Sequence, residues 1–272
     1  MKRITLCADD YAITPGVSDA ILTLGGQQRI HATSVLVTSP YWTQAEEASL
    51  KPLQSTMDIG LHLNFTEGSG LTRPFHQGLP GLWPMLWRSH CRLLVAEILE
   101  DEIQAQLDRF QQVMGVPPDF IDGHQHVHHL PQVRQALFRV LTRASLPKLW
   151  VRSVLPLINI TSPLKSLIIT ASGAKAMRQH LNQSTFYNNS GFAGIYSLQE
   201  GAAFDQLMTS WLSQLPDRGL IMCHPGIADS QINADHSAAR IKEFEYLSSS
   251  QFRDTLVNQR IKLSKLPQPS DS

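Results

Sequence analysis

The sequence predicts an α/β fold in which about seven parallel strands close into a barrel that is surrounded by helices. Short β-branched runs alternate with longer runs of helical periodicity, a pattern typical of a parallel sheet. Seven or so such units favour a barrel, and an open doubly wound sheet is the alternative. The 272 residues contain no repeat and no long linker, so we expect one domain over residues 1–272.

Six strand-like runs recur along the chain, each bounded by turn-forming residues. They are expected at 3–8, 33–38, 58–65, 119–122, 149–152 and 220–223. Polar residues follow several of them directly. The first run, RITLCA, ends at Asp9 and Asp10, and His62 lies near the end of the third.

Helical periodicity fills most of the remaining sequence. Helices are expected at about 14–24, 44–50, 93–114, 132–145, 163–182, 200–215 and 237–262. Thr14 followed by Pro15 is typical of a helix start, and Gly115 of a helix end. Residues 66–92 are rich in Gly, Pro and Trp, so we expect a loop there that serves either as a lid or as a contact surface.

Composition excludes several classes of protein. The 23 Lys and Arg residues balance the 23 Asp and Glu residues, so the formal net charge is 23 − 23 = 0. A neutral chain disfavours nucleic acid and anionic membranes as partners. No apolar run is long enough to span a bilayer. The apolar stretch within MKRITLCADD is too short for the apolar region of a secretory signal, so we do not expect export. The three cysteines are far apart, so we expect a cytoplasmic protein without disulfides or a zinc ribbon. No glycine-rich nucleotide-binding motif is present.

Polar residues gather at the carboxyl ends of the expected strands, which face one rim of a parallel barrel. They are Asp9, Asp10, His62, Asp122, His124 and His224. Two imidazoles and one carboxylate that converge there form a three-ligand site for a divalent metal and a reactive water. Each residue also has a structural interpretation by itself: a turn, a helix cap, a core histidine, or a solvated histidine tract.

Four motifs carry a resemblance to a known family, in family order and across nearly the whole chain. They are ADDYAITPGVSDAI from residue 8, GLHLNFTEG at 60–68, DFIDGHQHVHHLPQ at 119–132 and IMCHPG at 221–226. The sequence resembles the YdjC-like carbohydrate deacetylases, the chito-oligosaccharide deacetylase type, which includes members associated with hopanoid biosynthesis.

The resemblance implies a distorted (β/α) barrel, similar to a TIM barrel, and a metal-dependent hydrolase. The reaction would remove the acetyl group from an N-acetylated amino sugar or oligosaccharide and release acetate. By resemblance, Asp10, His62 and His124 hold the metal, Asp9 is the general base and His224 the general acid. Imidazole ligands favour Zn²⁺ or another transition ion, whereas the family is often described with Mg²⁺.

The chain departs from the family pattern at Tyr11 and Ala12, where Phe and Gly are more usual. The acidic residue that some members have after the strand at 149–152 is missing, and we expect Arg152 to contact the sugar. Tyr196, in an aromatic loop over residues 185–196, is expected to stack on a pyranose face, with ordinary packing as the alternative.

Two other functions stay open. One is a metal-dependent hydrolase of another amide or ester on the same scaffold. The other is a non-catalytic histidine-rich metal-binding protein, which predicts several ions through residues 124–129, whereas catalysis predicts one ion that depends on Asp10. The expected partner is a small acetylated sugar. A homodimer is left open, with Trp83 and Trp87 as candidate contact residues.

Overall fold

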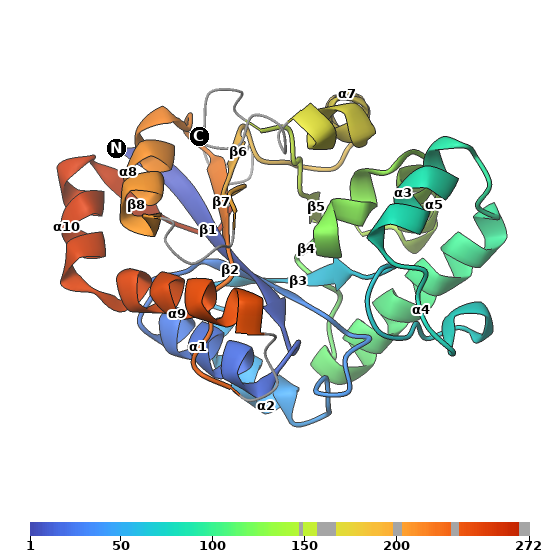
Figure 1. Ribbon diagram of the computed structural model, residues 1–272, viewed down its shortest axis with the longest axis horizontal. Helices are drawn as coiled ribbons and strands as arrows, with labels where there is room; N and C mark the ends of the chain where they lie inside the picture. The colour runs from blue at the N-terminus through green and yellow to red at the C-terminus, as the bar shows by residue number, and fades with distance from the viewer. Residues whose placement is uncertain (147–148, 157–166, 198–202, 230–233, 267–272) are drawn as a thin grey trace.

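The computed structural model describes residues 1–146, 149–156, 167–197, 203–229 and 234–266 (Figure 1). Parallel strands in the order β5-β4-β3-β2-β1-β7-β6 form a curled half-barrel with helices around it, which confirms the predicted distorted (β/α) barrel. A further strand, β8, pairs with the start of β1.

The strands are short except for β1. They are β1 Lys2–Tyr11, β2 Ala32–Val35, β3 Asp58–Leu63, β4 Phe120–Gly123, β5 Trp150–Val151, β6 Phe192–Ala193, β7 Gly219–Cys223 and β8 Ile261–Leu263. Six of these overlap the strands that the sequence predicts. The prediction missed β6 and β8, because two or three residues are too few to show an alternating pattern.

Helices account for most of the connections between strands. They are α1 Pro15–Gly26, α2 Glu46–Leu50, α3 Leu82–His90, α4 Ala96–Met114, α5 Pro131–Ala144, α7 Lys175–Asn182, α8 Phe204–Gln214, α9 Ala234–Ser248 and α10 Ser250–Asn258. The expected cap is present: the Thr14 hydroxyl accepts a hydrogen bond from the Val17 N–H at 3.3 Å. The prediction of a continuous loop over 66–92 was wrong, since α3 forms within it.

Parts of two predictions lie outside the described residues. They concern the beginnings of the helices expected at 163–182 and 200–215. None of the helices in the described ranges has both the length and the apolar character needed to cross a lipid bilayer.

The carboxyl end of β1 is irregular where it pairs with β2. Ala8 pairs with Thr33 and Tyr11 with Val35, so β1 has one extra residue between these pairs. Asp10 adopts the left-handed region, with φ 70°, which is uncommon for a residue other than glycine. Such bulges redirect side chains and are common beside functional sites. The strand thus runs past its predicted end, and Asp9 and Asp10 lie inside it.

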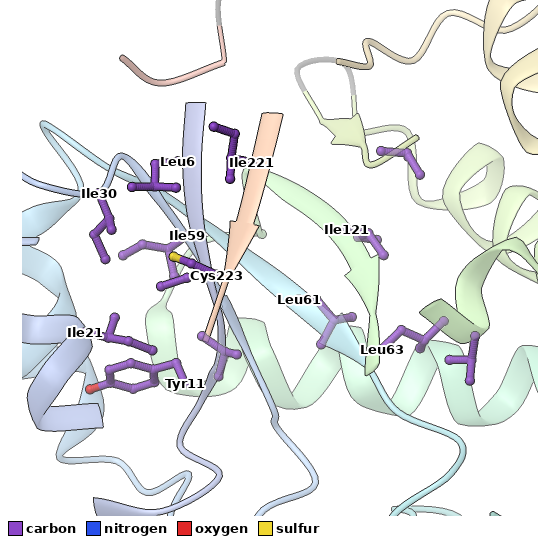
Figure 2. Close-up of a cluster of buried hydrophobic side chains, with 14 of the residues drawn as sticks. Leu6, Tyr11, Ile21, Ile30, Ile59, Leu61, Leu63, Ile121, Ile221 and Cys223 are labelled. Atoms are coloured by element: carbon purple, nitrogen blue, oxygen red, sulfur yellow. The ribbon is translucent and has the colours of Figure 1, made fainter. Parts of the chain in front are cut away.

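Apolar side chains from neighbouring strands form the core beneath this edge (Figure 2). Leu6, Ile59 and Ile121 on β1, β3 and β4 are each at most 1% exposed. Ile21 of α1 packs into the same cluster. In Figure 1, α1 and α9 lie side by side near β1, and α3, α4 and α5 group beyond β3 and β4. This packing fixes the strand ends relative to one another.

Candidate metal centre

A cavity of about 800 Å³ opens at the carboxyl ends of the central strands. The residues predicted for the site from the sequence lie in its wall, apart from Asp122 and Arg152. They are Asp9, Asp10, His62, His124, Tyr196 and His224. Side chains that are up to 215 positions apart in the sequence, such as Asp9 and His224 (224 − 9 = 215), are thereby brought to one hollow.

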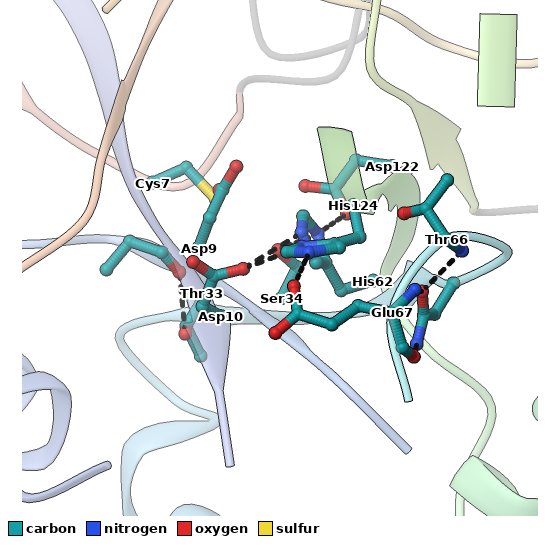
Figure 3. A network of polar contacts seen from close by, with 12 residues as sticks. Cys7, Asp9, Asp10, Thr33, Ser34, His62, Thr66, Glu67, Asp122 and His124 are labelled. Atoms are coloured by element: carbon teal, nitrogen blue, oxygen red, sulfur yellow. Dashed lines mark hydrogen bonds and ion pairs between the residues drawn. The ribbon is translucent and has the colours of Figure 1, made fainter. Parts of the chain in front are cut away.

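Asp10, His62 and His124 face one another at the floor of this cavity (Figure 3). The Asp10 Oδ1 atom lies 3.3 Å from His62 Nε2 and 3.1 Å from His124 Nδ1. One ligand atom from each residue can be chosen so that all lie within 4.8 Å of one another. Ligand atoms at about 2.0–2.2 Å from a divalent ion have mutual separations in this range, so the three residues fit such an ion.

His62 is oriented from behind by Asp122. The Asp122 Oδ1 atom lies 2.6 Å from His62 Nδ1, and the Ser34 hydroxyl lies 2.9 Å from the same nitrogen. This leaves Nε2 directed at Asp10, the arrangement in which an imidazole binds a metal through one nitrogen and donates to a carboxylate through the other. Burial by itself lowers the pKa of His62, but Asp122 and Asp10 outweigh it and raise the pKa to about 10.

Two residues that the sequence did not indicate complete the surroundings of Asp10 and His124. Arg240 of α9 donates to Asp10 Oδ2 at 2.5 Å, and Glu67 Oε2 lies 2.8 Å from His124 Nε2. Burial would raise the pKa of Asp10, but Arg240 and the two imidazoles hold it well below its usual range. Glu67 lies within the GLHLNFTEG motif and could have been singled out there, whereas nothing in the sequence around Arg240 marks it.

Asp9, the neighbour of Asp10, is held by a buried arginine instead. Arg152 donates through both terminal nitrogens to the two Asp9 oxygens at 2.6 Å, and its Nη2 lies 2.5 Å from Asp122 Oδ2. Burial favours the neutral acid, but Arg152 outweighs it and lowers the pKa of Asp9 to about 2. Arg152 is fully buried and is not part of the cavity wall, so the geometry does not provide the sugar contact expected for it.

The same guanidinium explains a second group of possible ligands. Cys7, Asp9 and Asp122 also offer atoms within 4.8 Å of one another. Arg152 Nη2 contacts all of them, lying 3.0 Å from the Cys7 sulfur. The Arg152 guanidinium therefore already occupies the place that a metal ion would take between these three residues.

His224 also lines the cavity, and it lies next to a buried acid. The His224 backbone N–H donates to Glu243 Oε2 at 2.5 Å, and the Tyr196 hydroxyl donates to the other Glu243 oxygen. Burial is the main reason that the pKa of His224 falls to about 4 and that of Glu243 rises to about 7. The His224 ring is therefore neutral at neutral pH. Glu243 comes from α9, and no sequence motif indicated it.

The remaining histidines of the tract 124–129 have structural partners. His128 Nε2 lies 3.1 Å from the Arg152 carbonyl oxygen, and His129 Nε2 lies 2.8 Å from the Ser172 hydroxyl. His126 reaches the cavity wall, with its ring edge-on to Phe192 at 5.8 Å. Among the described residues, neither group of three possible ligands includes any of these histidines.

Helix α3 contributes an aromatic residue to the mouth of the cavity. Leu82 and Trp83 line it, and Trp83 is 68% exposed. Trp87 on the same helix is 60% exposed but is not part of the wall. The segment 66–92 thus covers one side of the cavity through the first turn of α3.

The class of protein follows from the fold, the cavity and the order of the motifs. The chain belongs to the YdjC-like protein family, whose model matches residues 3–258. The chitooligosaccharide deacetylase of Yersinia pestis (strain Pestoides F) is similar to it, with 25% identity over 96% of this chain and 97% of the relative.

Two solved structures share the fold. A protein of Enterococcus faecalis V583, described as a candidate cellobiose-phosphate cleavage protein, superposes with a TM-score of 0.73 at 21% identity over 97% of both chains. A family 4 acetyl xylan esterase from Clostridium thermocellum, in complex with a cobalt ion, has a TM-score of 0.50 at 11% identity, covering 97% of this chain and 88% of the esterase. Both likenesses concern the fold alone.

Proposed function

We propose that this chain is a metal-dependent carbohydrate N-deacetylase that hydrolyses the acetamide of an N-acetylated amino sugar or oligosaccharide and releases acetate. The observation that carries the proposal is the convergence of Asp10 Oδ1, His62 Nε2 and His124 Nδ1 at the floor of a cavity of about 800 Å³ that Asp9 and His224 also line. The similarity to a chitooligosaccharide deacetylase over 96% of the chain supports the substrate class.

In this proposal Asp10, His62 and His124 hold one divalent ion, Zn²⁺ or Mg²⁺. Two imidazoles and a carboxylate favour zinc or a similar transition ion on ligand type. When bound, such an ion would polarise the acetamide carbonyl and lower the pKa of a water molecule. Arg240 keeps Asp10 ionised, and Asp122 keeps His62 turned toward the ion.

Asp9 is the proposed proton acceptor for the attacking water. Its pKa of about 2 keeps it ionised at any physiological pH. Its Oδ2 atom accepts one hydrogen bond from Arg152 and retains a further lone pair for a proton, whereas Oδ1 accepts from both Arg152 and the Cys7 thiol. We therefore assign Arg152 a positioning role behind Asp9, in place of the sugar contact expected from the sequence.

His224 is the proposed proton donor to the departing amine nitrogen, because an amine is a poor leaving group unless it is protonated. With a pKa of about 4, its ring starts neutral, so in this proposal it takes up a proton from solvent in the cavity before it donates, and Asp9 returns the proton of the attacking water to solvent. The Glu243 contact to the His224 backbone fixes the position of this residue in the wall. Tyr196, whose hydroxyl is bound to Glu243, would offer its ring face to the sugar.

The histidine-rich storage alternative is disfavoured, because His128 and His129 are bound to Arg152 and Ser172 and take no part in a three-ligand group among the described residues. Hydrolysis of an acetyl ester on the same site would use the same ion and the same water. A substrate comparison separates it from amide hydrolysis.

The test measures acetate released from a panel of N-acetylated sugars, with O-acetylated sugars in parallel, before and after chelator treatment and after adding back Zn²⁺ or Mg²⁺. We expect release from an N-acetylated sugar that chelator abolishes and metal restores. Asp9→Asn should retain the metal and lose turnover. Chelator-resistant release, or release from O-acetylated substrates only, would contradict the proposal.

A further inference from the structure

A second hollow, of about 730 Å³, lies far from the candidate metal centre along the sheet. Its wall combines the α1–β2 connection, the end of α9, the helix α10 and the end of β8. The residues are Gln27, Gln28, Arg29, His31, Ser248, Arg253, Leu256 and Leu263. His31 directly precedes β2, and Leu263 pairs with Ile4 near the start of β1, so the hollow lies at the amino edge of the sheet.

Arg29 is the unusual residue of this wall. It is only 8% exposed, and within the described ranges its side chain has neither a carboxylate partner nor a hydrogen bond. Arginine is rarely buried to this degree without a carboxylate partner, and since no nitrogen of Arg29 is among the fully buried unpaired atoms, its charged end opens on the hollow. The pKa of Arg29 is lowered, first by burial and then by the positive charge of Arg253.

Nothing in the described wall neutralises these two arginines, since no aspartate or glutamate is part of it. Two further groups in the wall are unsatisfied. The buried His31 Nδ1 and Ser248 Oγ atoms have no hydrogen-bond partner among the described residues. Buried polar atoms of this kind are rare in folded proteins and usually indicate a partner that the chain does not supply.

We propose that this hollow is a binding site for a tetrahedral oxyanion, a phosphate group that is either inorganic or carried by a phosphorylated metabolite. The planar guanidinium groups of Arg29 and Arg253 present paired N–H donors that match phosphate oxygens. The His31 and Ser248 side chains line the same hollow. The site is separate from the deacetylase centre, which occupies the carboxyl edge where barrel enzymes place their chemistry.

Calorimetric titration of the full chain with inorganic phosphate tests the proposal directly. Chelator-treated protein is used, so that phosphate does not report on a metal ion, and sodium chloride keeps the ionic strength constant. We expect one saturable site per chain and a higher unfolding temperature with phosphate, because a ligand that binds the folded state stabilises it.

Three variants assign the site. Arg29→Gln and Arg253→Gln should each raise the dissociation constant by about tenfold or more. Arg88→Gln, which removes the same charge from an exposed position on α3, should bind as the wild type does. Arg253 is exposed on α10, so its variant decides the question if Arg29→Gln does not fold.

Titration with a sugar phosphate beside inorganic phosphate distinguishes the two sources of the anion. Tighter binding of the sugar phosphate that is lost in Arg253→Gln supports a phosphorylated metabolite, and equal binding supports inorganic phosphate. Absence of saturable binding, or unchanged affinity in both arginine variants, overturns the proposal.

Discussion

The two edges of the sheet bury charged groups to a similar degree, but they differ in whether those charges have partners. At the carboxyl edge, Arg152 and Arg240 compensate Asp9 and Asp10, and both carboxyl pKa values fall. At the amino edge, the cation paired with Asp58 among the described residues is Lys265 at 3.4 Å, and burial, followed by the nearby Asp119, raises the pKa of Asp58 to about 6. Burial alone therefore does not set the charge of these carboxyl groups: the arginines outweigh it at Asp9 and Asp10, whereas it prevails at Asp58 and at Glu243.

A finer difference exists within the carboxyl edge. Asp9 and Asp10 are adjacent in β1, and each belongs to a group of three possible metal ligands. Arg152 contacts every member of the first group, Cys7, Asp9 and Asp122, whereas the second group, Asp10, His62 and His124, opens on the cavity. The bulge at Asp10 separates the two carboxylates, so one strand serves both a structural ion pair and a candidate metal centre.

Removing the Arg152 guanidinium from beside Cys7, Asp9 and Asp122 should have the largest effect, and the effect should be on the stability of the folded protein. Arg152→Met leaves Asp9 buried without its compensating charge and leaves Asp122 with His62 alone, and we expect a loss of about 3–5 kcal/mol in the free energy of unfolding. Urea denaturation at neutral pH measures it. Arg152→Lys, which keeps the charge but not the paired N–H geometry, should lose less. A loss below about 1 kcal/mol in Arg152→Met would show that this ion pair does not hold the edge together.

At the amino edge, Asp58→Asn should remove a pH dependence. Because the pKa of Asp58 is raised to about 6 in the folded chain, its protonated form is the stabilising one. Its contribution is complete below about pH 4 and is lost as the pH rises through about 6.

We expect the stability of the wild type to fall by about 2 kcal/mol relative to Asp58→Asn between pH 4 and 7 in urea denaturation. Trp150 Nε1 and the Leu266 N–H both bind the Asp58 Oδ2 atom, so an asparagine oxygen can retain both hydrogen bonds. Parallel stability curves for the two proteins would exclude a raised pKa at this position.

Asp122→Asn should weaken metal binding by about 10–100-fold, because it loosens the tautomer and orientation of His62. Ser34→Ala is the matched control, since it removes the other group at His62 Nδ1 while leaving the carboxylate. Calorimetric titration with Zn²⁺ measures both. An effect of Ser34→Ala as large as that of Asp122→Asn would argue against a special role of the carboxylate.

The smallest effect is expected at the cavity mouth. Trp83→Ala should raise KM for an N-acetylated oligosaccharide by about fivefold with little change in kcat, as expected for the loss of roughly 1 kcal/mol of stacking. Trp87→Ala, on the same helix but away from the wall, should leave KM unchanged. Equal effects of the two substitutions would place the contact elsewhere.

The sequence predicts the central strands and a gathering of polar residues at one rim, because the ends of parallel strands face the same side. The resemblance to the family is what selects Asp10, His62 and His124 among them. The sequence does not predict the partners of these residues. Arg240 and Glu243 come from α9, and their pairing with the strand ends depends on how that helix packs. Arg152 directly follows β5, so in the sequence it resembles the site residues at the ends of the other strands. Only the position of its guanidinium between Asp9 and Asp122 shows that it forms a buried ion pair and not a sugar contact.

The metal content of the wild type and of Asp10→Asn, each reconstituted with Zn²⁺ and dialysed, tests the central claim most directly. The wild type should retain one ion per chain, and Asp10→Asn should lose it while the circular dichroism spectrum stays that of a folded protein. Full zinc occupancy in Asp10→Asn, and likewise in His62→Ala and His124→Ala, would contradict a metal centre at the carboxyl edge.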